Sequence, residues 1–253
     1  MWGKHSMAWK CWLDAGLSFL YPEVCQYCGR EHATVEDGFV GSNCRQNVKV
    51  IQPPFCEHCG LPFEGAITNS FECSNCRQMT LHFSRARSAV AAQGMILEVI
   101  HRYKYQHALW FEPFLAQLLT GKAAGALVAE KWDLLVPVPL HPLKRSERDF
   151  NQAERLAQRL SAATGIPICA DLLCRVAPTR TQTQLSRSER AANVQRAFAC
   201  KRASARAAFK SKRVVLIDDV LTTGATTSAC AKVLRTHGAA EVCVWTVARG
   251  LLR

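Results

Sequence analysis

No apolar run in the 253-residue sequence approaches the roughly 20 residues that a membrane-spanning helix requires. The first 22 positions do not resemble an export leader, because Lys4, Lys10 and Asp14 interrupt their apolar residues. No long repeat covers the chain. Disorder is not expected either, since 49% of the residues are hydrophobic and suffice for a core. We therefore expect a folded cytoplasmic protein without a membrane span.

Cysteine is abundant, with 13 residues, and seven of these crowd between Cys25 and Cys76 at two-residue gaps. In a chain without an export signal this spacing indicates metal ligands rather than disulfides. One group follows the pattern Cys-x2-Cys-x13-Cys-x2-Cys, which matches a closed tetrahedral zinc site. Four unliganded thiols are the alternative, although metal binding supplies the folding energy of such small modules. The predicted ligands are Cys56, Cys59, Cys73 and Cys76.

A similar site is predicted upstream, with Cys25, Cys28 and Cys44 as ligands. Gly41 stands where the fourth ligand would complete the second Cys-x2-Cys pair. Two interpretations stay open for this module. Either His32 takes the place of the missing thiolate, or the module packs without metal.

Positive charge is concentrated in the second part of the chain. The net charge is +12, yet residues 1–80 have a balance of −2 and residues 81–253 a balance of +14. Residues 141–213 alone carry 16 basic and 5 acidic side chains. Such a field favours a polyanion or a polyphosphate ligand. The alternative is a solubilising surface without a specific partner.

The pattern changes near residue 80, where the cysteines thin out and apolar runs begin to alternate with amphipathic stretches. We therefore predict a cysteine-rich zinc-ribbon domain at 1–80 and an α/β domain at 81–253. Alternating strands and helices indicate a parallel sheet, whose ligands bind at the carboxyl ends of the strands. The expected strands are 133–140, 172–177, 214–217 and 241–247, and the expected helices are 151–164 and 225–236.

Two acids, Asp218 and Asp219, follow the strand expected at 214–217, and a hydroxyl-rich loop precedes the next helix. Because side chains alternate along a strand, the two carboxylates suit two separate hydroxyl groups better than one small ion. Unpaired amides at a helix start seat a phosphate, and no Walker A lysine stands here. The stretch therefore predicts a sugar monophosphate ligand. The phosphate-binding positions are Thr222, Thr223, Gly224, Ala225 and Thr226.

The sequence VVLIDDVLTTGAT resembles the phosphoribosyl pyrophosphate (PRPP) signature of type I phosphoribosyltransferases at every position. The resemblance implies that Asp218 and Asp219 contact the ribose hydroxyls and that the loop at 222–226 holds the 5′-phosphate. It also implies that Mg²⁺ accompanies the pyrophosphate. Two other interpretations remain: a Walker B strand, which has no Walker A partner upstream, and a strand and helix whose acids are incidental.

Basic residues precede this stretch in two further segments. Lys144, Arg145 and Arg148 follow the strand expected at 133–140 and are placed to meet pyrophosphate oxygens. The segment 178–198 contains Arg190 and is long for a structureless connection. We expect it to be a mobile cover that excludes water from the reacting sugar. A solvated surface charge is the alternative for any single arginine.

Four features together resemble the competence-protein ComF family, including its GntX branch: the CxxC-rich N-terminus, VPVPL followed by RxxRxFNQ, TQTQLSRSERAANVQRAF, and the PRPP signature. The resemblance covers nearly the whole chain and implies a double zinc ribbon followed by a type I phosphoribosyltransferase domain. It further implies handling of single-stranded DNA during natural transformation. Two positions depart from the family pattern. Asp149 stands where the family has a glycine, and Gly41 stands where a cysteine would complete the second Cys-x2-Cys pair of the first cysteine module.

Three functions fit these patterns. The first is binding of PRPP or a related sugar phosphate by a protein that handles single-stranded DNA, with other competence proteins as candidate partners. The second is transfer of ribose 5-phosphate from PRPP to a nitrogen acceptor, which depends on charge stabilisation of the departing pyrophosphate. The third is sensing of PRPP or a nucleotide without turnover. Phe55, Phe63 and Phe71 near the ribbons either stack bases or form a small core.

Overall fold

A four-stranded parallel sheet forms the centre of the computed structural model, which describes residues 23–63, 65, 71–140, 149–176, 197–201 and 205–251. The strand order is β1-β6-β5-β2, and all three pairings are parallel, which confirms the predicted α/β class. A short antiparallel pair, β3-β4, forms a second sheet. The strands are β1 (Arg85–Ala92), β2 (Leu134–Pro137), β3 (Leu173–Arg175), β4 (Phe198–Cys200), β5 (Arg213–Leu221) and β6 (Glu241–Gly250).

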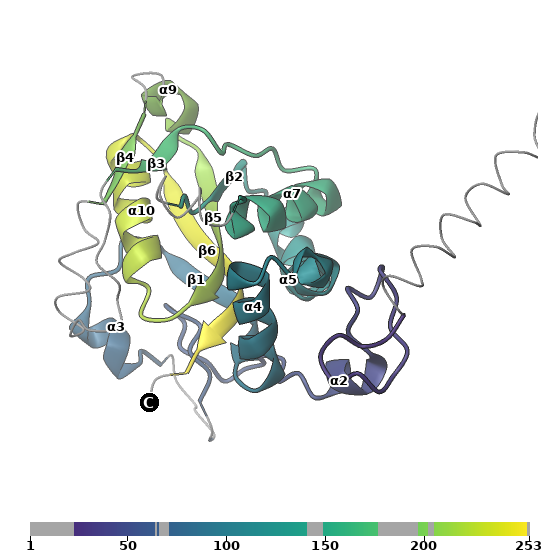
Figure 1. Ribbon diagram of the computed structural model, residues 1–253. Coiled ribbons are helices and arrows are strands. Elements are labelled where there is room, and N and C mark those ends of the chain that lie inside the picture. Colours follow the sequence, from purple (N-terminus) through teal and green to yellow (C-terminus); the bar gives the residue numbers. More distant parts are fainter. Residues whose placement is uncertain are drawn as a thin grey trace, which may run out of the picture.

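Helices cover both faces of the parallel sheet (Figure 1). One face packs against α4 (Met95–Tyr105), α5 (Glu112–Ala129) and α7 (Gln152–Thr164), with the 3-10 turn η1 (Leu109–Phe111) leading into α5. The other face packs against α10 (Ala225–Thr236) and α9 (Ala205–Phe209). Each layer encloses its own apolar core. Within the described residues, no helix combines the length and apolar character that crossing a membrane would need.

Both predicted helices are present in the structure. The residues that end them act through contacts with their near neighbours in the chain. Asn151 caps α7 by accepting a hydrogen bond from the Ala153 amide, and Gly165 ends it with a φ of 73°. The observed α10 has the predicted bounds, 225–236. Strand lengths were predicted less well. The strands expected at 133–140 and 172–177 are shorter in the structure, whereas those expected at 214–217 and 241–247 continue to Leu221 and Gly250.

The two cysteine modules lie on different sides of the sheet (Figure 1). The first contains α2 (Ser42–Gln46) and packs on α5, where the Arg45 guanidinium stacks over Phe114 and donates to Gln117. The second contains α3 (Ser74–Gln78) and packs beside β1, where the His58 carbonyl accepts the Ala86 amide at 2.7 Å. The predicted division at residue 80 falls between α3 and β1 and stays a prediction.

Candidate functional site

Asp218 and Asp219 lie within β5 rather than after it. The expectation that the strand ends at residue 217 was wrong, because positions 218–221 keep the parallel register with β6, from Asp218 opposite Thr246 to Leu221 opposite Arg249. Both acids line one pocket of about 390 Å³. Its lining also includes Thr222 and Thr226 from the loop that follows, so the acids open onto the carboxyl end of the sheet.

The two carboxylates face different layers of helices, as alternation along a strand predicts. Asp219 Oδ2 is 2.7 Å from the Nζ of Lys104, in the last turn of α4. Asp218 lies on the side of Cys230 in α10, where burial and then the Asp218 charge raise the pKa of the thiol well above its ordinary value. Because α4 and α10 cover opposite faces (Figure 1), the acids present their oxygens on two sides of the strand.

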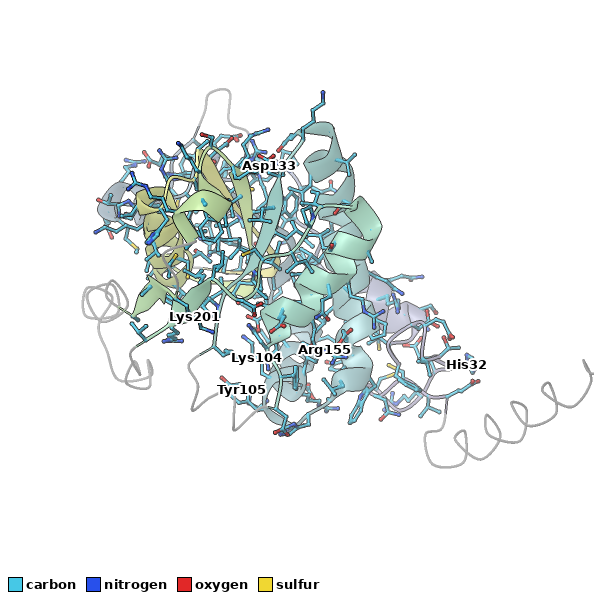
Figure 2. All side chains as sticks on the ribbon, turned by 90° about the horizontal axis from the view of Figure 1, so that it is seen from above. His32, Lys104, Tyr105, Asp133, Arg155 and Lys201 are labelled. Carbon is cyan, nitrogen blue, oxygen red and sulfur yellow. The ribbon has the colours of Figure 1, made fainter. Side chains whose placement is uncertain are left out.

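Lys104 is a residue of this pocket that the sequence analysis did not identify. Figure 2 shows it with Tyr105 at the opposite end of the sheet from Asp133, which precedes β2. Burial lowers the pKa of Lys104, but Asp219 and Asp218 raise it by more, so the net shift is upward and the amine stays charged. The expectation that both acids are partly exposed was wrong for Asp219. It is 6% exposed, and the lysine compensates its buried charge.

Asp218 titrates close to neutrality. Burial is the main cause that raises the pKa of its carboxyl, the neighbouring Asp219 charge is the second, and Lys104 opposes both. The pKa rises from an ordinary value of 3.8 to about 7. The charge of the Asp218 carboxyl therefore changes within the physiological pH range.

The loop between β5 and α10 lines a pocket at the start of the helix, and within it the Ala225 amide donates to Thr223 Oγ1 at 3.4 Å. Gly224, the N-cap of α10, has a φ of 86° in the left-handed region that favours glycine, and it has no side chain to cap the helix. A small pocket of about 50 Å³ opens here, lined by Asp218 and residues 220–227. It shares Asp218, Thr222 and Thr226 with the larger pocket. The pocket beside the acids and the pocket of the loop therefore adjoin each other.

A fully buried arginine fixes the start of this loop to the second cysteine module. Arg249, at the end of β6, donates from Nη1 to the Leu221 carbonyl at 3.0 Å and to the Thr222 carbonyl. Its Nε donates to the Cys59 carbonyl at 3.0 Å, and its Nη2 is 3.3 Å from Cys59 Sγ. One guanidinium thus joins a predicted zinc ligand to the loop at 222–226.

A second set of hydrogen bonds reinforces this connection. Asn75 in α3 is fully buried and donates from Nδ2 to the Thr223 carbonyl at 3.1 Å. Ser228 in α10 accepts the His82 amide at 3.0 Å and donates to the Thr80 carbonyl. The loop at 222–226 therefore depends on the second module for its position.

The four cysteines of the second module gather as predicted. Sulfur–sulfur distances are 3.7 Å for Cys56–Cys76, 3.5 Å for Cys59–Cys73 and 3.6 Å for Cys73–Cys76. A zinc tetrahedron with Zn–S bonds of about 2.3 Å has edges of about 3.8 Å, so the donors fit this ion. A hydrogen bond from the Cys59 thiol is the main cause that lowers the pKa of Cys56 to about 4; the same bond raises the pKa of Cys59, and burial raises that of Cys76. The geometry supports structural zinc.

The first module brings Cys25, Cys28 and Cys44 together, but not with His32. The His32 ring nitrogen Nε2 is 2.9 Å from a carboxylate oxygen of Glu23, and the His32 side chain is 68% exposed. Glu31 joins the three cysteines instead, with all four donor atoms within 4.8 Å of one another. The interpretation of His32 as a substitute ligand was therefore wrong.

The predicted pyrophosphate contacts Lys144, Arg145, Arg148 and Arg190 lie outside the described residues and stay predictions. The neighbouring Asp149 is described and has a φ of 59°, a conformation that aspartate tolerates and glycine favours. The positive φ at this position accounts for the glycine that the family pattern has there. The Asp149 side chain is 82% exposed and lies 3.8 Å from the His107 ring.

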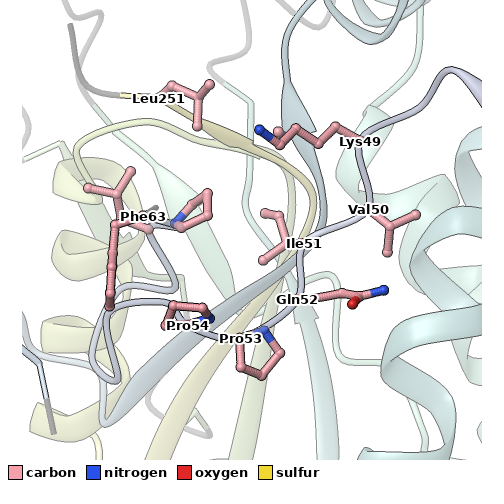
Figure 3. A pocket seen from close by; sticks show the side chains of 11 residues that line it. Lys49, Val50, Ile51, Gln52, Pro53, Pro54, Phe63 and Leu251 are labelled. Atoms are coloured by element: carbon pink, nitrogen blue, oxygen red, sulfur yellow. The ribbon is translucent and has the colours of Figure 1, made fainter. Parts of the chain in front are cut away.

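A different pocket, of about 430 Å³, lies between the two cysteine modules and the end of β1 (Figure 3). Its described lining includes Ile51, Pro54 and Phe63 and contains no acidic residue, so it does not suit ribose hydroxyls. Phe63 packs against Phe71 at a ring distance of 4.3 Å, and Phe71 contacts the second cysteine cluster. These contacts favour the core interpretation of the two rings over base stacking.

Comparisons with known proteins match both parts of the chain. A double zinc ribbon domain matches residues 16–80, and a phosphoribosyl transferase domain matches residues 150–251. Competence protein F of Haemophilus influenzae is 32% identical over 89% of this chain and 96% of its own length. The DNA utilization protein YhgH of Salmonella typhimurium is 29% identical over 97% of both chains. Among solved structures, a hypoxanthine phosphoribosyltransferase from Staphylococcus aureus is 13% identical over 54% of this chain and 73% of its own, with a TM-score of 0.36.

The match to Competence protein F extends over nearly the full length of both proteins, and it includes the cysteine modules as well as the α/β domain. The order of the two domains is the one that the sequence patterns predict. The chain therefore belongs to the competence-protein ComF family, which joins a double zinc ribbon to a phosphoribosyltransferase domain.

Proposed function

We propose that the protein binds PRPP or a related sugar phosphate and acts on single-stranded DNA during DNA uptake. One observation carries the first part: the two acids of β5 and the residues at the start of α10 line two adjoining pockets at the carboxyl end of a parallel sheet. The names Competence protein F and DNA utilization protein, given to two relatives, support the second part.

Each end of the ligand has its own partners in this arrangement. Two ribose hydroxyls donate to Asp218 and Asp219, and the 5′-phosphate accepts hydrogen bonds from amides of the loop at 222–226. The charged amine of Lys104, 2.7 Å from Asp219 Oδ2, orients this carboxylate. Mg²⁺ would neutralise the pyrophosphate, and we assign the contacts to its oxygens to Lys144, Arg145, Arg148 and Arg190.

Calorimetric titration with PRPP and Mg²⁺ tests the ligand directly. We expect saturable binding with one site per chain. Ribose 5-phosphate should bind more weakly, because it lacks the pyrophosphate that the basic residues contact, and pyrophosphate alone should bind more weakly still. The absence of saturable binding of PRPP would exclude the proposed ligand.

The binding of single-stranded DNA is tested by fluorescence anisotropy with a labelled oligonucleotide. Residues 141–213 carry 16 basic and 5 acidic side chains, so we expect binding at low salt whose affinity falls steeply as salt rises. A duplex of the same sequence is measured in parallel, to compare the affinities for single-stranded and double-stranded DNA. If the oligonucleotide does not bind at low salt, the proposed role on DNA loses its physical basis.

Transfer of ribose 5-phosphate to a nitrogen acceptor is a second candidate function. The pocket beside the acids has a volume of about 390 Å³, and His101, Tyr105 and Arg175 also line it. These side chains offer partners to an acceptor base or amine. Release of pyrophosphate from PRPP, measured with a panel of nucleobases and amines, distinguishes transfer from binding alone. If none of the nucleobases and amines causes release of pyrophosphate at PRPP concentrations that saturate the site, the result favours binding without turnover.

The affinity for PRPP should depend on pH through Asp218. Because the pKa of this carboxyl is raised to about 7, the group is mostly protonated at pH 6 and mostly ionised at pH 8. The ionised Asp218 carboxylate accepts a ribose hydroxyl more strongly than the neutral acid does, so we expect affinity to rise by up to about tenfold between these values. Calorimetry at constant ionic strength measures the change. Since phosphate groups of the ligand also titrate, the Asp218→Asn variant provides the baseline and should show a smaller rise.

The same raised pKa has the opposite effect on stability. The folded state holds the Asp218 proton more tightly than the unfolded chain, where the ordinary value is 3.8. The free energy of unfolding should therefore fall as pH rises from about 4 to about 7. Thermal unfolding of wild type and Asp218→Asn across this range measures the difference. Parallel pH profiles for the two proteins would show that Asp218 does not titrate near neutrality.

A further inference from the structure

The two cysteine modules contain an identical five-residue helix, and the residue before it differs. Both α2 and α3 have the sequence SNCRQ, preceded by Gly41 in the first module and by the zinc-ligand candidate Cys73 in the second. The backbone is the same at both positions, with φ −70° and ψ 163° at Gly41 and φ −73° and ψ 161° at Cys73. Gly41 therefore occupies a ligand position from which the ligand side chain is missing.

The carboxylate of Glu31 fills the space that this missing side chain would take. A Cβ atom added to Gly41 would lie 2.1 Å from Glu31 Cδ and 2.6 Å from Glu31 Oε1. Real atoms without a bond between them do not approach so closely. A cysteine at position 41 and the observed Glu31 carboxylate consequently exclude each other, and the glycine is what gives the carboxylate its place.

Hydrogen bonds hold the carboxylate among the three cysteines. Glu31 Oε1 accepts the Cys44 amide at 3.1 Å and lies 3.7 Å from Cys28 Sγ, while Oε2 accepts the Asn43 amide at 2.9 Å. The Glu31 carbonyl also accepts the Cys25 amide at 2.7 Å. The side chain is therefore oriented by the module itself. Its position does not depend on a neighbouring charge.

We propose that Glu31 is the fourth ligand of a zinc site whose other ligands are Cys25, Cys28 and Cys44. Carboxylate oxygens bind zinc at about 2.0–2.2 Å, close to the length of a thiolate bond of about 2.3 Å, so one tetrahedron accommodates both. The charge of the filled site is the same as with four thiolates, because one anion replaces another. The carboxylate is the harder donor, and zinc prefers soft thiolates. The first module therefore releases zinc before the second under a chelator.

Zinc content of the purified full-length protein tests this assignment. We expect two zinc ions per chain in the wild type and one in Glu31→Ala. Glu23→Ala is the matched control, since Glu23 belongs to the same module but pairs with the exposed His32, and it should keep two. One zinc ion in the wild type, or two in Glu31→Ala, would overturn the assignment.

A swap of ligands separates coordination from a general loss of structure. The double variant Gly41→Cys/Glu31→Ala removes the clash and supplies a thiolate, so it should regain two zinc ions and hold them longer against a chelator. Zinc X-ray absorption measures the donors without any need for a variant. We expect an average of about 3.5 sulfur atoms per zinc in the wild type and about 4 in the double variant. A double variant with one zinc, or a wild type with 4 sulfur atoms per zinc, contradicts the proposal.

Discussion

The double variant Asp218→Asn/Asp219→Asn should bind PRPP at least roughly a hundredfold more weakly than the wild type. A hydrogen bond to a charged group contributes about 1.5–3 kcal/mol, and two such bonds are lost. A loss of about 3 kcal/mol corresponds to about two factors of ten in the dissociation constant. Asparagine keeps the shape of each side chain, so the pocket stays open. Calorimetric titration with PRPP and Mg²⁺ measures the change.

Asp133→Asn is the matched control for this variant, because Asp133 lies at the opposite end of the sheet (Figure 2) and should leave PRPP affinity unchanged. Stability must be measured alongside binding. Asp219→Asn leaves the buried amine of Lys104 without its partner, which we expect to lower the free energy of unfolding by up to about 3 kcal/mol. Asp218 ranks below Asp219 among the charges that raise the pKa of Lys104, so Asp218→Asn should cost less stability. An unchanged affinity in the folded double variant would show that the ligand binds elsewhere.

Loss of the second zinc site should weaken PRPP binding, whereas loss of the first should not. Among the described residues, only the second module is joined to the loop at 222–226, through Arg249 and Asn75. Without zinc, the turn around Cys59 loses the geometry that holds the guanidinium, and the carbonyls of Leu221, which is buried, and of the more exposed Thr222 and Thr223 lose their donors. Each unsatisfied carbonyl costs about 1–3 kcal/mol, so we expect affinity to fall by roughly tenfold or more.

The duplicated modules supply the control for this experiment. Cys59→Ser and Cys28→Ser each remove one candidate ligand of equivalent position, and both should lose zinc. The first module packs on α5 and makes no described contact with the loop at 222–226. PRPP affinity should therefore fall in Cys59→Ser alone. Zinc content, circular dichroism and calorimetry are measured on both proteins. Equal affinity in the two variants would show that the contacts through Arg249 do not position the loop.

Local signals explain what the sequence predicts well. Asn151 and Gly165 mark the ends of α7 through hydrogen bonds and backbone conformations that involve only their neighbours. The cysteine pattern predicts the second cluster because the ligands of a ribbon are fixed by short spacings. The signature at 214–226 predicts the crevice for a similar reason. Its acids and amides lie within one strand, one loop and one helix start.

The features that the sequence analysis missed depend on contacts between distant segments. Lys104 pairs with Asp219 across the pocket, and this pairing lets β5 continue through Asp218 and Asp219. From the sequence alone, two adjacent acids indicate the end of a buried strand. Arg249 looks like one more basic residue near a strand end, yet it is fully buried between a ribbon and a loop. Glu31 was missed because histidine was considered as the substitute ligand, although a comparison of GSNCRQ with CSNCRQ isolates Gly41 as the changed position.

Hydrogen–deuterium exchange with and without PRPP and Mg²⁺ tests most directly whether the crevice between β5 and α10 is the ligand site. A phosphate held by the helix start covers the amides of the loop at 222–226, so peptides from this segment should exchange more slowly when PRPP is bound. Peptides from the pocket around Phe63 should not change. Protection at the Phe63 pocket with unchanged exchange at 222–226, under saturating PRPP, would contradict the account.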